Sequence, residues 1–444
     1  MLKFMTIGFG LLLLSGCTSY GVIDNDELTG AASTRSYSVK PQQGRRGTGD
    51  ILFTLAFSGG GTRAAALAYG VMQELRDTRI KVNGRKRTLL DEVDTISSVS
   101  GGSFTSAYYG LYGDRIFEDY EEVFLRRNVE RSLIRGVLNP LNWFRSTGRT
   151  EMAIKYYEKK VFHNATFADM QRQGGPLIAI NASDLGYGVR FTFVQEYFNL
   201  LCSDISTYPV ARAVTASSAV PVLFNPVVLE NYKSCKSQKP AWLLAAKKRA
   251  ANDPQLKQIV EGVESYYKRD KRQYAHFVDG GITDNLGLRA PYEIVTVMGG
   301  AKSYLKKSGV THPSRLVFIS VDASTHLEPE MDSSRKQPSL KETIGAVSNA
   351  QLHRYNTDTL ELIDKSLTQW SRELSTGGKR VKPYFVQLGI QDIGQPEELH
   401  FLNSIPTSFN LSDEQVDRLI AAGRQLLRNN PDFKHFLASV GGAR

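Results

Sequence analysis

The sequence predicts an α/β fold with a mostly parallel central sheet and helices on both of its faces. Two observations support this class. From residue 51 onward, short apolar runs alternate with amphipathic stretches, and 41% hydrophobic against 23% charged residues suits a protein with a large buried core. Strands that alternate with helices favour a parallel sheet, because each crossover lays a helix over one of its faces.

The elements follow one another along the chain according to these patterns. Strands are expected over residues 51–57, 93–99, 177–182, 191–194, 277–278, 316–321 and 384–388. Helices are expected over residues 62–76, 101–111, 288–297, 340–374 and 412–428. Asp413 and Glu414 fall in the first turn of the last helix, where acidic side chains suit the helix dipole.

The charge balance indicates an anionic partner. The 444 residues hold 55 Lys and Arg against 45 Asp and Glu, which gives a net charge of +10. Such an excess favours either nucleic acid or a phospholipid surface. No recognised nucleic-acid-binding motif accompanies the charge, so no nucleic-acid partner is expected. The composition also excludes wholesale disorder, collagen and coiled-coil arrays.

The first residues have the features of a secretion signal. Lys3 precedes the apolar run 4–14, which is too short to span a bilayer as a mature helix. Residues 14–17, Leu-Ser-Gly-Cys, resemble the lipobox of bacterial lipoproteins. This resemblance implies a signal peptide over residues 1–16 and a lipid anchor on Cys17. Thr18, in place of Asp, implies the outer membrane. An ordinary signal peptide with a coincidental cysteine is the alternative.

The first of three glycine-containing loops joins a predicted strand to a helix and reads Ser-Gly-Gly-Gly-Thr-Arg over residues 58–63. Consecutive glycines let backbone N–H groups converge on one point, and a helix N-terminus favours negative charge there. The loop suits either a phosphate cradle or an oxyanion hole. A Walker lysine is missing, which weakens the phosphate interpretation, and a plain glycine turn is the simpler alternative.

The second loop, Ser-Val-Ser-Gly-Gly-Ser over residues 98–103, also lies between a strand and a helix. It matches the nucleophile elbow G-x-S-x-G except that Ser98 replaces the first glycine. Ser100 would project from the strand end, and the N–H of Gly101 could face a developing oxyanion. Ser97, Ser98 and Ser103 leave open which serine attacks, and a Ser/Gly-rich helix cap is the alternative.

The third loop, His-Phe-Val-Asp-Gly-Gly over residues 276–281, ends an apolar strand in Asp279. A carboxylate there lies at the carboxyl edge of the sheet, where open α/β folds place their sites. An aspartate that only stabilises its own turn is the alternative.

Together, the three loops in this order resemble the patatin-like phospholipase family. Residues 213–226, AVTASSAVPVLFNP, and residues 181–185, NASDL, are similar to two further family segments, and the resemblance covers about residues 51–319. It implies a three-layer sandwich and a Ser–Asp dyad. Ser100 would be the nucleophile and Asp279 its acid partner. Gly59, Gly60 and Gly61, with Gly101, would form the oxyanion hole, and Arg63 would bind the substrate phosphate.

The implied activity is hydrolysis of lipid esters through an acyl-enzyme, as in a phospholipase A, lysophospholipase or esterase. A carboxylate held against a serine hydroxyl can accept its proton, so this chemistry needs neither metal nor cofactor. Acyl transfer would use the same residues, and a non-catalytic lipid-binding lipoprotein is the alternative from another class. None of the seven histidines lies in a recognisable triad motif, and all are expected to be structural or surface residues.

Composition and the resemblance together suggest how the chain is divided. Residues 17–50 are polar and predict a flexible tether, and residues 51–330 predict the catalytic domain. Within it, the basic stretch 231–275 predicts an insertion that faces either anionic lipid or solvent. Residues 331–444 are expected to complete the same domain.

Residues 131–145 mix apolar side chains with arginines, which suits a membrane boundary or a core helix. Whether Cys202 and Cys235 pair stays open.

Overall fold

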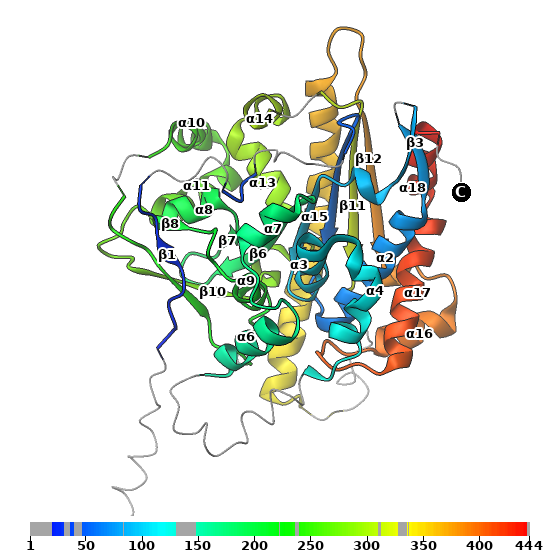
Figure 1. Cartoon of the computed structure of the whole chain (residues 1–444), viewed down its shortest axis with the longest axis horizontal. Coiled ribbons are helices and arrows are strands. Elements are labelled where there is room, and N and C mark those ends of the chain that lie inside the picture. The colour runs from blue at the N-terminus through cyan, green and yellow to red at the C-terminus, as the bar shows by residue number, and fades with distance from the viewer. Residues whose placement is uncertain are drawn as a thin grey trace, which may run out of the picture.

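The computed structural model of the chain describes residues 20–30, 36–39, 47–82, 84–129, 148–221, 223–235, 239–309, 312–326, 335 and 337–441. Figure 1 shows a central sheet between helices, in the alternation that the sequence predicts. Cys17 and residues 131–145 lie outside the described residues, so their expected roles stay predictions.

An eight-stranded sheet forms the centre of the described part of the chain. Five strands run parallel, in the order β12 (Lys382–Gly389), β11 (Arg315–Asp322), β2 (Ile51–Phe57), β5 (Thr95–Val99) and β6 (Leu177–Asp184). Antiparallel pairing then adds β10 (Tyr274–Val278), β7 (Val189–Thr192) and β9 (Val227–Glu230). The prediction of a mostly parallel sheet is confirmed.

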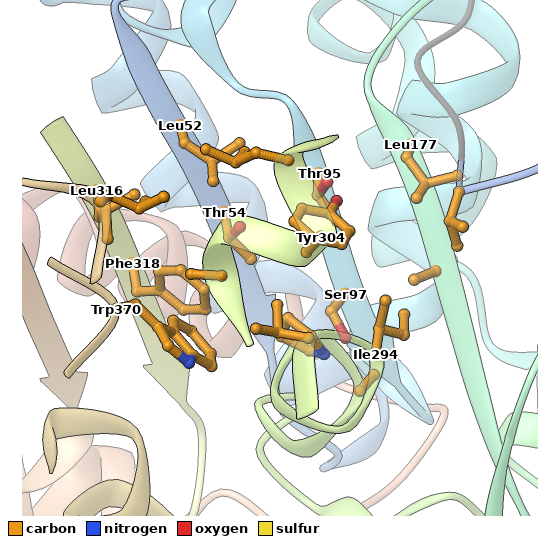
Figure 2. A pocket seen from close by; sticks show the side chains of 18 residues that line it. Leu52, Thr54, Thr95, Ser97, Leu177, Ile294, Tyr304, Leu316, Phe318 and Trp370 are labelled. Carbon is orange, nitrogen blue, oxygen red and sulfur yellow. The ribbon is translucent and has the colours of Figure 1, made fainter. Parts of the chain in front are cut away.

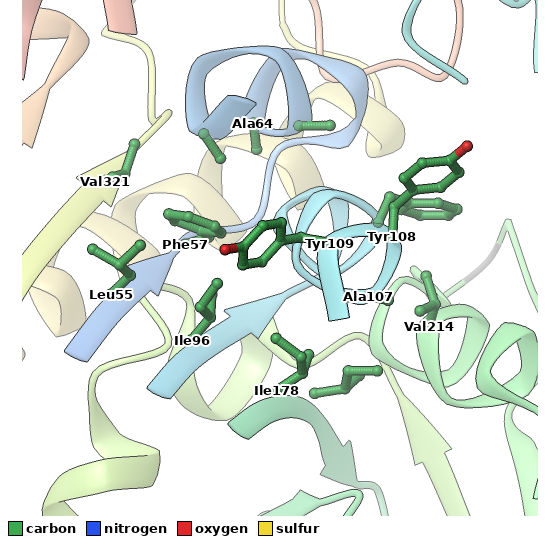
Figure 3. Close-up of a cluster of buried hydrophobic side chains, with 14 of the residues drawn as sticks. Leu55, Phe57, Ala64, Ile96, Ala107, Tyr108, Tyr109, Ile178, Val214 and Val321 are labelled. Atoms are coloured by element: carbon green, nitrogen blue, oxygen red, sulfur yellow. The ribbon is translucent and has the colours of Figure 1, made fainter. Parts of the chain in front are cut away.

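One face of the sheet is covered by α2 (Gly61–Asp77), α3 (Gly101–Tyr112) and α9 (Val210–Ser217). Side chains alternate along a strand, so β2 directs Leu55 and Phe57 to this layer. Figure 3 shows both near Ala64 of α2 and Tyr109 of α3, all of them buried. The layer fixes α2 and α3, whose first residues carry two of the glycine-containing loops.

The opposite face is covered by α13 (Arg289–Met298), α14 (Ala301–Ser308) and α15 (Leu340–Leu374). A cavity of about 50 Å³ lies in this layer. Figure 2 shows side chains that line it, among them Leu52 and Thr54 of β2 with Ile294 and Tyr304 of the covering helices. Among the described residues that line this cavity there is no carboxylate, histidine or cysteine, and neither Ser100 nor Asp279 is one of them. We therefore assign it to the packing of the helices on the sheet.

Further helices complete the layers. They are α4 (Ile116–Tyr120), α6 (Arg149–Lys160), α7 (Phe167–Gln173), α8 (Gln195–Phe198), α10 (Ala241–Arg249), α11 (Pro254–Ser265), α12 (Gly281–Asp284), α16 (Pro396–Ser404), α17 (Asp413–Asn429) and α18 (Pro431–Ser439). Two short antiparallel pairs lie outside the main sheet, namely β1 (Asp26–Glu27) with β8 (Ser203–Asp204) and β3 (Arg79–Val82) with β4 (Arg85–Thr88). Helices α2 and α17 approach closely, since a Cβ at Gly70 would lie 2.2 Å from the carbonyl oxygen of Ile420.

The expectation of a flexible tether over residues 17–50 is wrong for the parts that the structure describes. β1 adds to β8, and the Asn25 side chain donates to the carbonyl oxygen of Glu230 over 3.0 Å. Tyr37 is 2% exposed, and its hydroxyl accepts the N–H of Ile178 on β6 over 2.6 Å. These polar residues have specific partners on the folded body, which composition alone does not reveal.

Cys202 and Cys235 form a disulfide, so the open question of their pairing is resolved. Their Cα atoms are 5.6 Å apart, within the range that a disulfide bridges. The bond closes a loop of 33 positions, and a loop of that length stabilises a protein by roughly 3 to 4 kcal/mol through its effect on the unfolded chain. Cys202 also holds the N-terminal segment, because its carbonyl oxygen accepts the N–H of Leu28 over 2.8 Å.

The basic stretch 231–275 folds as α10 and α11, and several of its cations have partners within the protein. Lys239 and Lys247 both contact Glu264, at 2.6 and 2.9 Å. Arg272 is buried, pairs with Asp184 at the end of β6 and lies over the Tyr266 ring. These cations stabilise the insertion and its attachment to β6, which weakens the expectation of a lipid-facing surface. Among the described residues, no helix is both long and apolar enough to cross a membrane.

Candidate active site

Ser100 lies in a sharp turn between β5 and α3. Its backbone has φ 49° and ψ −121°, a conformation that a residue with a side chain rarely adopts. The following glycines make the turn possible, because a Cβ at Gly101 would lie 1.9 Å from the carbonyl oxygen of Gly61 and one at Gly102 2.7 Å from the Cβ of Phe57. This is the geometry of the predicted nucleophile elbow.

The hydroxyl of Ser100 donates to Asp279 Oδ2 over 2.8 Å, across 179 positions of sequence. Asp279 follows the end of β10, and its other oxygen, Oδ1, accepts the N–H of Gly281 over 2.8 Å. The close approach requires Gly280, because a Cβ there would lie 2.3 Å from the carbonyl oxygen of Asn181. The structure thus brings the two predicted side chains into direct contact, with both carboxylate oxygens occupied.

The neighbouring serines have other partners. Ser98 Oγ lies 2.6 Å from Ser106 Oγ, and Ser97 Oγ accepts the side-chain N–H of Asn181 over 3.0 Å. Ser98 therefore occupies the position of the usual elbow glycine without disturbing the turn, because its side chain points to α3. The only one of these serines hydrogen-bonded to an acid in the described chain is Ser100.

Burial controls the acidity of Asp279. The side chain has little contact with water, and this loss of hydration raises its pKa to about 6. The hydrogen bonds from Gly281 and Ser100 oppose the rise, because they stabilise the ionised form. At neutral pH the carboxylate is ionised but has a higher proton affinity than an exposed aspartate. Such a group suits the removal of a proton from a serine.

The glycine loop lies against this pair, as expected for an oxyanion hole. A Cβ at Gly59 would be 3.4 Å from the Cβ of Ser100. The expectation for Gly59 itself needs correction, because its N–H donates to the carbonyl oxygen of Asn285 over 3.0 Å. Gly60, Gly61 and Gly101 are the remaining candidates, since their N–H groups donate to no acceptor within the described residues.

The structure gives Arg63 a role other than the predicted binding of phosphate. The side chain is 5% exposed, and its Nε, Nη1 and Nη2 donate to Ala323 O, Ile405 O and Thr407 Oγ1 at 2.8, 2.6 and 3.0 Å. Burial lowers its pKa to about 10, an effect that the charge of Asp322 opposes. Arg63 stays charged at neutral pH and joins the start of α2 to the residue after β11 and to the loop after α16.

The histidines do not complete a triad in the described chain, where no hydrogen bond joins a histidine to Ser100 or Asp279. His326 and His353 face each other with ring centroids 4.2 Å apart. Burial and the neighbouring His326 lower the pKa of His353. The geometry is that of a two-residue site, Ser100 with Asp279.

Two residues that sequence reasoning did not single out belong to the site. Asn285 accepts the N–H of Gly59 through its backbone, and its Oδ1 would lie 2.9 Å from a Cβ at that glycine. Ser217 accepts the N–H of Ser100 over 2.9 Å. Ser217 lies in the family-like segment 213–226, which was a usable signal, whereas Asn285 belongs to no motif.

Comparison with known proteins identifies a matching family. The family described as patatin-like phospholipase matches residues 55–292, which include Gly59 to Gly61, Ser100 and Asp279. No curated protein matches the chain significantly.

Solved structures also resemble the chain. Human GIVD cytosolic phospholipase A2 is 12% identical over 88% of this chain with a TM-score of 0.44, and VipD from Legionella pneumophila is 12% identical over 97% with a TM-score of 0.30. The match spans 60% of the human chain and 73% of VipD. The family match extends over more than half of the residues of this chain, so the chain belongs to the patatin-like phospholipase family.

Proposed function

We propose that this protein hydrolyses carboxylic esters of lipids, with Ser100 as nucleophile and Asp279 as its base. The observation that carries the proposal is the 2.8 Å contact between Ser100 Oγ and Asp279 Oδ2 beside the glycine loop. Membership of the patatin-like phospholipase family supports a lipid substrate.

The residues suit a two-step reaction. Ser100 Oγ attacks the ester carbonyl while Asp279 accepts the hydroxyl proton of Ser100. N–H groups of Gly60, Gly61 and Gly101 stabilise the negative charge that develops on the carbonyl oxygen. The tetrahedral intermediate collapses to an acyl-enzyme, and the alcohol leaves with the proton that Asp279 returns. Water then attacks the acyl-enzyme, Asp279 takes a proton from that water, and Ser100 regains a proton as the fatty acid departs. An acceptor alcohol in place of water would give acyl transfer with the same groups.

Phospholipid is the substrate class that we favour, in keeping with the family and the net charge of +10. The burial of Arg63 means that headgroup phosphate has to be recognised by other groups. The test is to incubate the purified protein with a fluorophosphonate and with vesicles of phosphatidylcholine or lysophosphatidylcholine. Labelling at Ser100 with release of fatty acid is expected. A folded protein that does neither would instead be a non-catalytic lipid-binding protein.

The pH dependence follows from the pKa of Asp279. The base works only when ionised, so the rate constant for fluorophosphonate inactivation is expected to fall about tenfold per pH unit below pH 6 and to level off above it. Inactivation is the better measurement, because the probe has no titrating group and substrate ionisation plays no part. An acid limb centred near pH 4 would contradict the burial of the carboxylate.

We further propose that the mature protein is held at the outer membrane of a bacterial envelope by a lipid on Cys17. The motif at residues 14–17 supports this proposal. Replacing Cys17 with serine in the full chain is expected to move the protein from the membrane fraction to the soluble fraction. Retention of the variant in the membrane fraction would contradict the lipid anchor.

A further inference from the structure

Ser217, the last residue of α9, forms hydrogen bonds to both of the loops that carry the candidate dyad. Its hydroxyl oxygen accepts the N–H of Ser100 over 2.9 Å. Its carbonyl oxygen accepts the N–H of Gly280, the residue after Asp279, over 3.0 Å. Two positions further on, the carbonyl oxygen of Ala219 accepts the N–H of Asp279 itself over 3.0 Å. Residues 217–219 therefore join two loops that are far apart in sequence.

The direction of each hydrogen bond at Ser217 follows from its neighbours. The carbonyl oxygen of Asn181, 2.6 Å from Ser217 Oγ, can only accept, so the single hydroxyl proton of Ser217 points to it. The N–H of Ser100 and the hydroxyl of Ser103, at 2.9 and 3.0 Å, must then donate to the two lone pairs of Ser217. The fully buried hydroxyl has every donor and acceptor position occupied.

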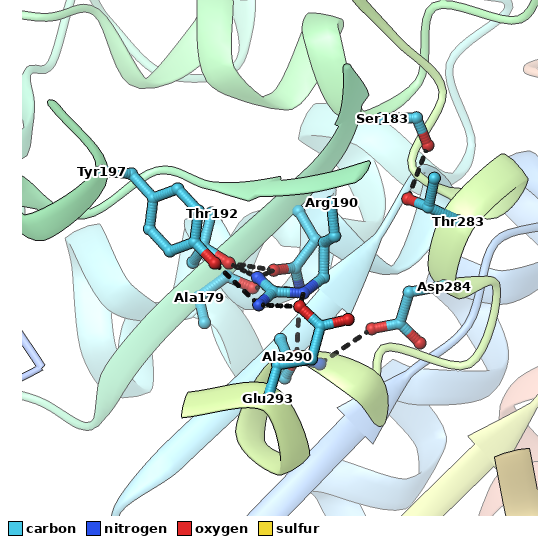
Figure 4. Close-up of polar contacts among 11 residues, drawn as sticks. Ala179, Ser183, Arg190, Thr192, Tyr197, Thr283, Asp284, Ala290 and Glu293 are labelled. Atoms are coloured by element: carbon cyan, nitrogen blue, oxygen red, sulfur yellow. Dashed lines mark hydrogen bonds and ion pairs between the residues drawn. The ribbon is translucent and has the colours of Figure 1, made fainter. Parts of the chain in front are cut away.

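Asn181, whose carbonyl oxygen accepts the hydroxyl proton of Ser217, is itself held by a buried polar network. Asn181 Nδ2 donates to Ser97 Oγ over 3.0 Å and to the carbonyl oxygen of Ser98, the first residue of the elbow, over 3.2 Å. Its Oδ1 accepts Thr192 Oγ1 over 2.6 Å and Arg190 Nη1 over 3.3 Å. Figure 4 shows the guanidinium of Arg190 between Thr192, Tyr197 and Glu293. The acceptor that orients the Ser217 hydroxyl is therefore fixed.

We propose that Ser217 is a positioning residue. It holds the turn at Ser100 so that Ser100 Oγ stays within hydrogen-bonding distance of Asp279 Oδ2. This inference rests on the proposed function, because its readout is the reactivity of Ser100. The Ser100 backbone has positive φ, a conformation that persists only where its surroundings enforce it. Without the Ser217 hydroxyl, the buried N–H of Ser100 has no acceptor, and the turn relaxes to find one. A small displacement of Oγ from the 2.8 Å contact reduces the rate steeply.

The neighbouring Ser218 provides a matched control. Ser217 and Ser218 are both buried at the end of α9, but the Ser218 hydroxyl donates only to Val214 O and Thr215 O within the same helix. The experiment measures kcat, KM and the fluorophosphonate inactivation rate of Ser217→Ala and Ser218→Ala. It also records their unfolding midpoints and the hydrogen exchange of the Ser100 amide.

For Ser217→Ala we expect kcat and the inactivation rate to fall roughly 10- to 100-fold with KM nearly unchanged. The Ser100 amide should exchange at least about tenfold faster, since it has lost its acceptor. The acid limb of the pH profile should stay where it is, because Asp279 keeps its surroundings. Ser218→Ala should stay within about threefold of the wild type in rate, and its unfolding midpoint should fall less than that of Ser217→Ala, because its hydroxyl bonds only to carbonyl oxygens of its own helix.

The outcomes separate this proposal from the proposed function. Equal inactivation rates for the two alanine variants, with labelling of the wild type intact, would overturn the role of Ser217 alone. A wild type that neither labels nor hydrolyses would overturn both proposals. If Ser217→Ala does not fold, Ser217→Cys, similar in size with a weaker acceptor, replaces it: a slowed reaction supports the proposal and a wild-type rate refutes it.

Discussion

Replacing Ser100 with alanine, or Asp279 with asparagine, is expected to lower ester hydrolysis by roughly 10⁴-fold or more while leaving the fold intact. Alanine removes the attacking oxygen. Asparagine keeps the shape of the acid but cannot accept the proton of Ser100. The measurement is fatty-acid release from phospholipid vesicles by each purified variant, with circular dichroism to establish folding. Asp284→Asn is a suitable control.

Asp284 matches Asp279 in most respects except the contact with Ser100. It is buried five positions further along, burial raises its pKa to about 6, and its Oδ2 accepts the N–H of Ala290 over 3.1 Å. We therefore expect Asp284→Asn to retain activity within a few-fold of the wild type. If Asp279→Asn behaved in the same way, the proposed base would be wrong.

Asp279→Asn is also expected to be more stable than the wild type at pH 8, with a free energy of unfolding higher by about 1 to 3 kcal/mol. The folded pKa of about 6 exceeds the ordinary value of 3.8, so folding disfavours the ionised form of this group. The cost is absent below about pH 4, grows between pH 4 and 6, and is complete above pH 6. Urea unfolding of both proteins at pH 4 and pH 8 measures the difference. A variant that is less stable than the wild type at pH 8 would argue against this cost.

Replacing Gly101 with alanine is expected to cost at least about 10²-fold in activity, because the new methyl group displaces the oxyanion loop. The added Cβ would lie 1.9 Å from the carbonyl oxygen of Gly61 and 2.7 Å from its nitrogen. Backbone atoms cannot give way as a flexible side chain can, so Gly61 has to move. The measurement is the fluorophosphonate inactivation rate together with kcat.

Gly394→Ala controls for the general effect of the substitution. A Cβ added at Gly394 would have no heavy atom within 4 Å, and the residue has no positive φ, so we expect full activity in that variant. The Gly101 variant is also expected to unfold at lower denaturant concentration, with a loss of about 1 to 3 kcal/mol. Full activity in Gly101→Ala would mean that the Gly61 peptide takes no part in the reaction.

Much of the site could be predicted from the sequence because three motifs follow three strands. In a sheet with parallel strands, the carboxyl ends of β2 and β5 lie at one edge, so the glycine loop and the elbow had to be neighbours. The position of Asp279 could not be predicted from strand order along the chain. Asp279 follows an antiparallel strand, β10, and only the pairing of β10 with β6 brings its loop to Ser100.

The assignments that needed correction depend on partners distant in sequence. Arg63 follows the glycines, as a phosphate-binding arginine would, but its hydrogen-bond partners are 260 to 344 positions away. The N–H of Gly59 meets Asn285, which no motif marks. In the same way, the polar composition of residues 17–50 predicts a tether, whereas Tyr37 is buried against β6.

The sequence by itself determined the alternation of strands and helices and the glycine positions that allow tight turns, and its motifs pointed to Ser100 and Asp279. These are local properties, because apolar periodicity and backbone freedom depend on near neighbours in the chain. Only the tertiary structure decided which N–H groups remain available, that Arg63 is a structural cation, and that Ser217 joins the two loops. A buried donor or acceptor takes whichever partner the packing brings to it, and packing is a property of the whole chain.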